Sequence, residues 1–145
     1  MDLPLFDEPS HPRLQTYEHD HTRRWSETIS RGDAFAFVMP EYNFGYNAAL
    51  KNAIDYLWHE WNDKPVALVG YGGVSGGLRA IQGIKPVLTA VRLQYAAEVP
   101  IPFVHQIVQD SRVEANDPMR KGAEGALDAL ARAVRLRDAA AAGQA

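Results

Sequence analysis

The sequence predicts an α/β fold with a parallel sheet, because short unbroken apolar segments alternate with amphipathic helical segments. Residues 34–39 and 66–71 are continuously apolar, which is typical of strands buried on both faces of a parallel sheet. The segments around them carry apolar residues at helical spacing. The expected order is helix, strand, helix, strand, helix, strand, helix, and such alternation favours right-handed crossovers between parallel strands.

The chain before the first strand is expected to be an extended lead-in followed by one helix. Residues 1–13 contain three prolines, so they are not expected to form a regular element. Residues 16–30 are polar and compatible with a helix, which the following Gly32 should stop. Its face is marked at intervals of four by Tyr17, His21, Trp25 and Ile29.

Two further helices are expected on either side of the second strand. Asn47 is a suitable N-cap for the first of them, which should run to Trp61. The apolar face of that helix consists of Leu50, Ala53, Ile54, Leu57, Trp58 and Trp61. The next helix should cover residues 78–93, with a kink or a break at Pro86.

The last third of the sequence predicts an edge strand and a final helix. Residues 99–108 are apolar and β-branched but contain Pro100 and Pro102, which restricts them to a sheet edge. Asp117-Pro118 is a typical helix start. The stripe of the final helix consists of Ala123, Ala126, Leu127, Leu130 and Val134. We expect one domain over residues 1–138 and a disordered alanine-rich tail over residues 139–145.

The composition narrows the class of protein. The chain has 145 residues, a formal net charge of −3 and no cysteine. This charge gives no electrostatic case for binding nucleic acid or an anionic membrane surface. Without cysteine there is no disulfide, no thiolate metal site and no Cys nucleophile. No apolar segment is long enough to cross a membrane, and no secretory signal is recognised. A cytoplasmic protein is expected.

Two unusual loops follow the first two strands, at the edge of the sheet where ligands of open α/β folds bind. The first, Pro40–Tyr46, contains two tyrosines and a phenylalanine that offer flat faces for stacking. The second, Gly72–Gly77, has four glycines in six residues, so that a planar ligand could approach its backbone. Each loop leads into a helix N-terminus. Together they predict a site for a flat heterocycle such as a flavin.

The motif Pro40-Glu41-Tyr42-Asn43, followed by Leu50-Lys51-Asn52-Ala53-Ile54-Asp55-Tyr56, resembles the NADPH-dependent FMN reductase family. That family includes quinone, azo-dye and chromate reductases. The similarity continues through Gly72–Ala80 and reaches back to Asp2-Leu3-Pro4-Leu5-Phe6-Asp7. It implies a flavodoxin-like three-layer sandwich with a parallel sheet.

The resemblance also implies a chemistry and a set of contacts. NAD(P)H would reduce FMN by hydride transfer, and electrons would then pass to a small-molecule acceptor such as a quinone, an azo compound or free flavin. The flavin does this chemistry, so no catalytic acid or base of the protein is expected, and the helix after Gly77 could stabilise charge on the reduced ring. Such proteins are homodimers or homotetramers. The residues expected at the ring are Pro40, Glu41, Tyr42 and Asn43, with Gly72, Gly73, Ser75, Gly76 and Gly77 opposite.

One departure from the family pattern concerns the phosphate of FMN. Family members begin with a strand and a Gly-Ser-Thr-Arg-like loop that binds this phosphate, and the sequence lacks that strand, that loop and most of the second strand. We therefore expect a sheet of the remaining strands, in which residues 34–39 form an exposed apolar edge. We also expect FMN affinity weaker than low-micromolar, or none.

Three alternatives to a flavoenzyme are a hydrolase, a metal-binding protein and a cofactor-free subunit. Gly73-Val74-Ser75-Gly76-Gly77 fits the G-x-S-x-G turn of α/β-hydrolases, although the last histidine, His105, precedes Asp110 and no histidine follows it. His19-Asp20-His21 with His11 suggests a metal site, but a solvated helix face explains it better. His59-Glu60 has Asp63 where a zincin has its second histidine, so no metal is expected.

The third alternative is a cofactor-free, flavodoxin-like interaction subunit or a degenerate paralogue. In that case Trp58 and Trp61, which share a predicted helix face, would serve a dimer interface. Core packing is the commoner fate of such residues.

Overall fold

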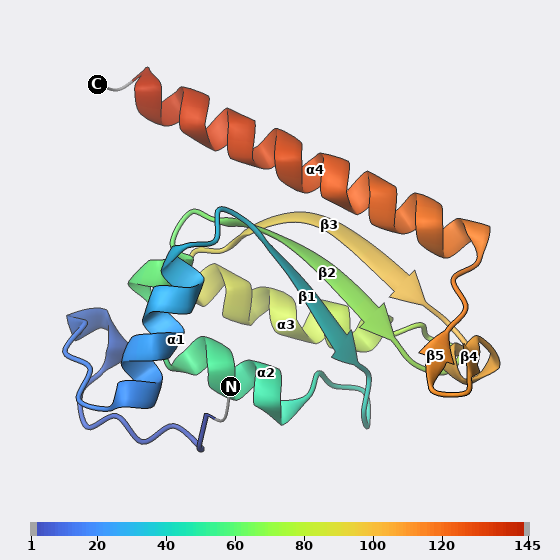
Figure 1. Cartoon of the computed structure of the whole chain (residues 1–145), viewed down its shortest axis with the longest axis horizontal. Coiled ribbons are helices and arrows are strands. Elements are labelled where there is room, and N and C mark those ends of the chain that lie inside the picture. Colours follow the sequence, from blue (N-terminus) through green and yellow to red (C-terminus); the bar gives the residue numbers. More distant parts are fainter. Residues whose placement is uncertain (1–2, 144–145) are drawn as a thin grey trace.

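The computed structural model describes residues 3–143 and has three layers (Figure 1). The middle layer is a parallel sheet of β1 (Phe35–Pro40), β2 (Pro65–Tyr71) and β3 (Gln94–Ile101), in the order β1-β2-β3. Helices α1 (Asp20–Ser30), α2 (Ala48–Asp55) and α3 (Leu78–Ala90) lie on one side of it. Helix α4 (Asp117–Ala142) crosses the other side. The predicted class, the parallel sheet and the order of the main elements are confirmed.

Short elements connect these layers. Three 3-10 turns, η1 (Pro12–Leu14), η2 (His59–Trp61) and η3 (Val104–Gln106), lie between the longer elements. An antiparallel pair, β4 (Val108–Gln109) and β5 (Arg112–Val113), stands between β3 and α4. The sequence predicted neither η1 nor the β4–β5 pair.

The core has a large and a small part, one on each face of the sheet. The large part lies on the α2 and α3 side and includes Met39, Leu68 and Ile84, which are fully buried. The small part, under α4, consists of Ala67, Val99, Ala126 and Leu130. Burial of apolar area on both sides of β2 explains why its sequence is an unbroken apolar run.

Strand β1 is an edge strand, and its two faces differ. Phe37 and Met39 are buried against the helices, whereas Ala36 and Val38 are exposed on the opposite face, Val38 by 65%. The prediction that residues 34–39 are buried on both faces is wrong, because α4 covers β2 and β3. The expected exposed apolar edge is confirmed.

Three element boundaries differ from the sequence-based expectation. Helix α2 ends at Asp55 instead of Trp61, and the remaining residues form a turn and η2. Helix α3 continues through Pro86 without a break, because this residue lies on the solvent-exposed side, where the freed carbonyl can bind water. Strand β3 begins at Gln94 and ends at Ile101, earlier than predicted.

The alanine-rich end of the chain belongs to α4 as far as Ala142. We expected order to end at residue 138, but alanine has the highest intrinsic helix propensity and extends the helix. The final two residues of the predicted tail, 144–145, lie outside the described residues. Asn116 caps the start of α4 by accepting a hydrogen bond from the Met119 amide at 3.0 Å. Within residues 3–143, no helix combines the length and apolar character needed to cross a membrane.

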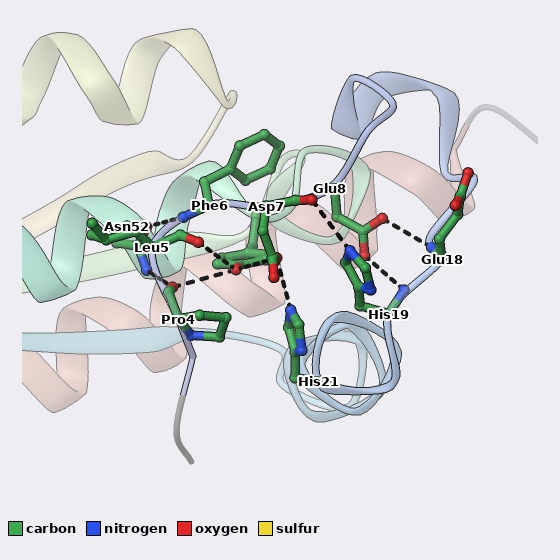
Figure 2. Close-up of polar contacts among 10 residues, drawn as sticks. Pro4, Leu5, Phe6, Asp7, Glu8, Glu18, His19, His21 and Asn52 are labelled. Carbon is green, nitrogen blue, oxygen red and sulfur yellow. Dashed lines mark hydrogen bonds and ion pairs between the residues drawn. The ribbon is translucent and has the colours of Figure 1, made fainter.

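The N-terminal segment is fastened to α1 and α2 by polar side chains (Figure 2). Asn52 of α2 accepts from the Phe6 amide at 2.9 Å and donates to the Pro4 carbonyl at 2.6 Å. The carboxylate of Asp7 accepts from the Tyr56 hydroxyl at 2.7 Å and lies 2.9 Å from Nε2 of His21. These contacts hold the proline-containing lead-in in one place although it has no regular structure.

Candidate functional site

The two loops singled out in the sequence lie next to each other at the carboxyl ends of β1 and β2. The strands are paired in parallel register, with Pro40 opposite Tyr71. The amide of Glu41 then donates to the Tyr71 carbonyl at 2.9 Å, so the pairing continues one residue into the loops. The sequence prediction that both loops meet at one edge of the sheet therefore agrees with the structure.

The first loop folds back on itself as a tight turn from Tyr42 to Gly45. The amide of each of these residues donates to the carbonyl of the other, at 3.0 and 2.9 Å. Asn43 and Phe44 between them both have positive φ, 47° and 68°, as two-residue hairpin turns require. The turn leaves Tyr42 and Phe44 exposed by 67% and 71%, so that their aromatic faces are available to a ligand.

The glycines of the second loop have two different roles. A Cβ at Gly77 would lie 2.5 Å from the carbonyl carbon of Gly70, and one at Gly76 would lie 3.0 Å from the Pro102 nitrogen. Both residues also have positive φ, 83° and 62°. Glycine is thus required there by contacts within the protein. Around Gly73, in contrast, no atom lies within 4 Å of an added Cβ, which leaves open space for a ligand.

The glycine loop is also fastened to the chain that leaves β3. The Gly76 carbonyl accepts from the Ile101 amide at 3.0 Å, and the carbonyls of Gly73 and Gly72 accept from the amides of Phe103 and Val104 at 2.9 and 3.0 Å. These bonds fix the loop backbone. The amides of Gly73, Val74 and Ser75, by contrast, find no acceptor in the described part of the chain.

Glu41 joins the two loops. Its Oε1 accepts from the Ser75 hydroxyl at 2.8 Å and from Nη1 of Arg79 at 3.1 Å, and its Oε2 accepts from the Arg79 amide at 3.0 Å. Burial opposes ionisation of this carboxyl, but the hydrogen bonds from Ser75 and Arg79 outweigh it, so its pKa lies below the ordinary value of 4.5. The side chain is 7% exposed.

The N-terminus of α3 is consequently closed by a side chain from the neighbouring loop. Arg79 is the second residue of α3, and its amide is one of those that a helix leaves without an internal partner. Glu41 accepts this hydrogen bond. We expected this helix end to stabilise charge on a ligand, but within residues 3–143 the Arg79 amide already has a carboxylate partner.

The predicted site residues divide into those that face open space and those that hold the loops. Tyr42, Asn43 and Gly73 are exposed at the two loop tips, and Gly72 is half-buried. Glu41 and Ser75 bind each other. Gly76 and Gly77 are buried at the base of the glycine loop, and Pro40 is the half-buried last residue of β1.

Sequence reasoning overlooked Arg79. Its guanidinium lies 4.2 Å from the centroid of the Phe44 ring, a cation–π distance, and it also pairs with Glu41. The signal in the sequence was an arginine directly after the glycine loop, two residues beyond Gly77.

The alternative assignment of Ser75 as a hydrolase nucleophile has no support in this geometry. Its hydroxyl donates to Glu41, and a carboxylate with a lowered pKa is a weak base. Serine nucleophiles are activated by a histidine or a comparable base. Nor do the two tryptophans form a shared interface: Trp61 is 1% exposed and lies in the core.

The residues fit the polar edge and the aromatic faces of an isoalloxazine ring. Three successive amides without acceptors, at Gly73, Val74 and Ser75, match a heterocycle edge rich in oxygen and nitrogen acceptors. Open space beside Gly73 and the exposed ring of Tyr42 would admit a flat ligand. No group of three metal-binding side chains occurs within residues 3–143.

A parallel sheet with helices on both faces, and with paired ligand loops at its carboxyl edge, defines a flavodoxin-like α/β protein. Comparison with known proteins specifies the class further. The sequence profile of the NADPH-dependent FMN reductase family matches residues 1–106, and the chain belongs to this family.

Individual relatives agree with this assignment. The chain is 44% identical over 100 residues to an NAD(P)H-dependent FMN reductase of Schizosaccharomyces pombe, covering 68% of this chain and 50% of that protein. It is 30% identical over 143 residues to a quinone reductase of Pseudomonas putida, covering 93% and 75%. The flavoenzyme NAD(P)H:(acceptor) oxidoreductase FerB of Paracoccus denitrificans has the same fold, with a TM-score of 0.69 at 23% identity over 94% of this chain and 77% of that one.

The chain is shorter than these relatives. It spans 50% of the length of the Schizosaccharomyces pombe protein and 62% of the NAD(P)H-dependent FMN reductase of Saccharomyces cerevisiae, to which it is 37% identical over 119 residues, 73% of this chain.

Proposed function

We propose that this protein is an FMN-dependent NAD(P)H oxidoreductase. The observation that carries the proposal is the pairing of the aromatic turn with the glycine loop. It places the exposed ring of Tyr42 at the same edge of the sheet as the amides of Gly73, Val74 and Ser75, which have no acceptor within residues 3–143. Membership of the FMN reductase family, and relatives named as FMN and quinone reductases, support it.

The protein's part in this reaction is to hold and orient the cofactor. When bound, FMN accepts a hydride from NAD(P)H and passes electrons to the second substrate. Gly73, Val74 and Ser75 would donate hydrogen bonds from their amides to the polar edge of the ring, and Tyr42 would cover an apolar part of it. The two loops would be shaped around it by Pro40, Asn43, Gly72, Gly76 and Gly77. Glu41 would hold the loops together through its hydrogen bonds.

We propose a quinone, an azo compound or free flavin as the electron acceptor. An apolar cavity of about 410 Å³ at the same edge of the sheet supports an acceptor of low polarity. It is formed by residues from β1, β2, β3, the β4–β5 pair and α4: Val38, Tyr71, Ile101, Val104, Ile107, Val108, Ser111, Val113 and Met119.

A cytoplasmic location and a homodimer or homotetramer complete the proposal. The absence of cysteine from the sequence is compatible with a reducing compartment. The unpaired apolar edge at β1, where Val38 is 65% exposed, offers a surface on which a second subunit could bury apolar area.

Flavin binding and electron transfer test the proposal together. Titration of the purified chain with FMN, followed by quenching of flavin fluorescence, should give saturable 1:1 binding that is weaker than low-micromolar, and the complex should oxidise NADH or NADPH in the presence of a quinone. Gly73→Leu is the variant that tests the site, because a Cβ there meets no atom within 4 Å and a larger side chain would occupy the open space beside the loop. It should remain folded and lose flavin affinity. A wild-type chain that neither binds FMN nor oxidises either nucleotide would contradict the proposal.

A further inference from the structure

The carboxylate of Glu41 is the most constrained charged group beside the proposed flavin site. It lies one residue beyond the end of β1, yet its hydrogen-bond partners all belong to the segment that follows β2: the hydroxyl of Ser75 and both the amide and the guanidinium of Arg79. With 7% of the side chain exposed, water contributes little to its solvation. Such a carboxylate is stable only while its donors stay in place.

This arrangement couples the carboxylate to the three amides without acceptors. Ser75 belongs to the glycine loop and supplies one of those amides, while its hydroxyl is held at 2.8 Å by Glu41. The other end of the loop is held because Glu41 accepts from the Arg79 amide at the start of α3. The segment from Gly73 to Arg79 is therefore attached at two points to one side chain of the neighbouring strand.

The same side chain places a negative charge between the two loops of the proposed site. Arg79 is its counter-ion at 3.1 Å, but the side chain of Arg79 is 48% exposed and its guanidinium also contacts the Phe44 ring. Charge interactions are strong where water is largely excluded. A carboxylate in this position disfavours additional electrons on a neighbouring cofactor, because reduction adds negative charge.

We propose that Glu41 is a positioning residue with an electrostatic effect and does not itself bind the flavin. It fixes the glycine loop through Ser75 and Arg79, so that the loop amides point toward the ring, and its charge lowers the affinity for reduced relative to oxidised FMN. The electrostatic part rests on the proposed function. The positioning part concerns the protein alone.

The test compares Glu41→Gln and Glu41→Ala with wild type, first without flavin. Amide hydrogen exchange of Gly76, Leu78 and Arg79, whose amides each have an acceptor, reports whether the loop is held in place. Glu41→Ala removes every acceptor and should accelerate this exchange at least tenfold, whereas Glu41→Gln keeps one oxygen acceptor and should accelerate it less. Ser75→Ala should accelerate exchange of the Gly76 amide in the loop but not that of the Arg79 amide, which keeps its carboxylate acceptor. Unchanged exchange in Glu41→Ala would overturn the positioning role.

The second measurement is the ratio of FMN affinities in the reduced and the oxidised state. Glu41→Gln leaves the shape nearly unchanged but removes the charge, so this ratio should rise by roughly tenfold. Ser75→Ala should leave the ratio unchanged, because the charge remains. An unchanged ratio in Glu41→Gln would overturn the electrostatic effect, since a purely structural role does not depend on the charge of the side chain.

Glu98→Gln provides the matched control. Glu98 is a carboxylate of β3 that also accepts from a cation and a hydroxyl, Lys85 at 2.9 Å and Tyr95 at 3.0 Å, but among the described residues its side chain forms no hydrogen bond or ion pair with either loop. Its substitution should change neither measurement. If wild type binds no flavin, the electrostatic part fails together with the proposed function, whereas the exchange measurement still decides the positioning role. Circular dichroism verifies that each variant is folded.

Discussion

Gly77 and Gly70 are in direct backbone contact: a Cβ on Gly77 would lie 2.5 Å from the carbonyl carbon of Gly70. Gly77 also has a φ of 83°, which disfavours every residue with a side chain. The contact joins the start of α3 to the end of β2, so the position of the glycine loop depends on two residues without side chains.

Gly77→Ala is therefore expected to be strongly destabilising. Both the clash with the backbone and the positive φ must be relieved by moving α3, and we expect a loss of about 3 kcal/mol or more in the free energy of unfolding. Urea denaturation measures it. Gly73→Ala is the control, since its Cβ meets nothing, and it should change stability by less than about 1 kcal/mol. Equal effects of the two substitutions would contradict this account.

The elements that were predicted well are those whose formation depends on local sequence. The apolar runs of β1 and β2 contain no competing helical periodicity, and Asn116, Asp117 and Pro118 form a strong helix start. The loops at the strand ends follow directly from this order, because all parallel strands end at one edge.

The elements that were predicted poorly depend on partners distant in sequence. Helix α1 begins at Asp20 instead of Thr16, because the carboxylate of Glu8 accepts from the amides of Glu18 and His19. Helix α2 ends early because indole N–H groups bind its last carbonyls, Trp25 that of Ala53 and Trp61 that of Ile54.

In the candidate site, sequence reasoning identified the segments but not the role of every residue in them. Glu41 was expected at the ring, whereas its side chain binds Ser75 and Arg79. The pattern Pro-Glu-Tyr-Asn cannot show the direction of a side chain. Similarly, the glycine-rich composition of residues 72–77 did not reveal that Gly76 and Gly77 are required by contacts with the protein's own backbone.

Trp61 should be the more important of the two neighbouring tryptophans. It is 1% exposed, contacts Phe35 and Phe37, and donates to the Ile54 carbonyl at 3.1 Å. Trp61→Ala should lower the free energy of unfolding by about 3 to 5 kcal/mol. Trp61→Phe, which keeps an aromatic ring but loses the N–H donor, should cost about 1 to 3 kcal/mol.

Trp58 provides the comparison for that prediction. It is half-buried and lies under the guanidinium of Arg13 at 4.7 Å from the ring centroid. Because part of its surface already contacts water, Trp58→Ala should cost less than half as much as Trp61→Ala in the same urea denaturation experiment. A larger loss for Trp58 would mean that the core is centred elsewhere.

Asp7 should contribute to stability in a pH-dependent manner. The hydrogen bond from Tyr56 lowers the pKa of this carboxyl below its ordinary value of 3.8; burial opposes the effect and His21 adds to it. A pKa that is lower in the folded than in the unfolded protein gives stability that is present above 3.8 and is lost as the pH falls through the folded-state pKa.

Asp7→Asn should therefore make the free energy of unfolding less dependent on pH in the acid range. The free energy of unfolding of wild type should fall more steeply than that of the variant between about pH 5 and about pH 3, when measured with urea at each pH. Asp128→Asn is the control, because Asp128 is exposed on α4 and its side chain makes no hydrogen bond or ion pair within residues 3–143. An equal fall in the free energy of unfolding with pH for wild type and Asp7→Asn would contradict the prediction.

The edge of β1 should control self-association. Val38 is 65% exposed on β1, the edge strand next to β2, and lysine on such an edge opposes pairing with another chain. Val38→Lys should shift the association observed by sedimentation velocity to higher protein concentration, without a loss of stability, because the side chain is in contact with water. Leu127→Lys, at a leucine that is 63% exposed on α4, adds the same charge outside the sheet. It should leave association unchanged, and equal effects of the two lysines would show that net charge, rather than strand pairing, governs association.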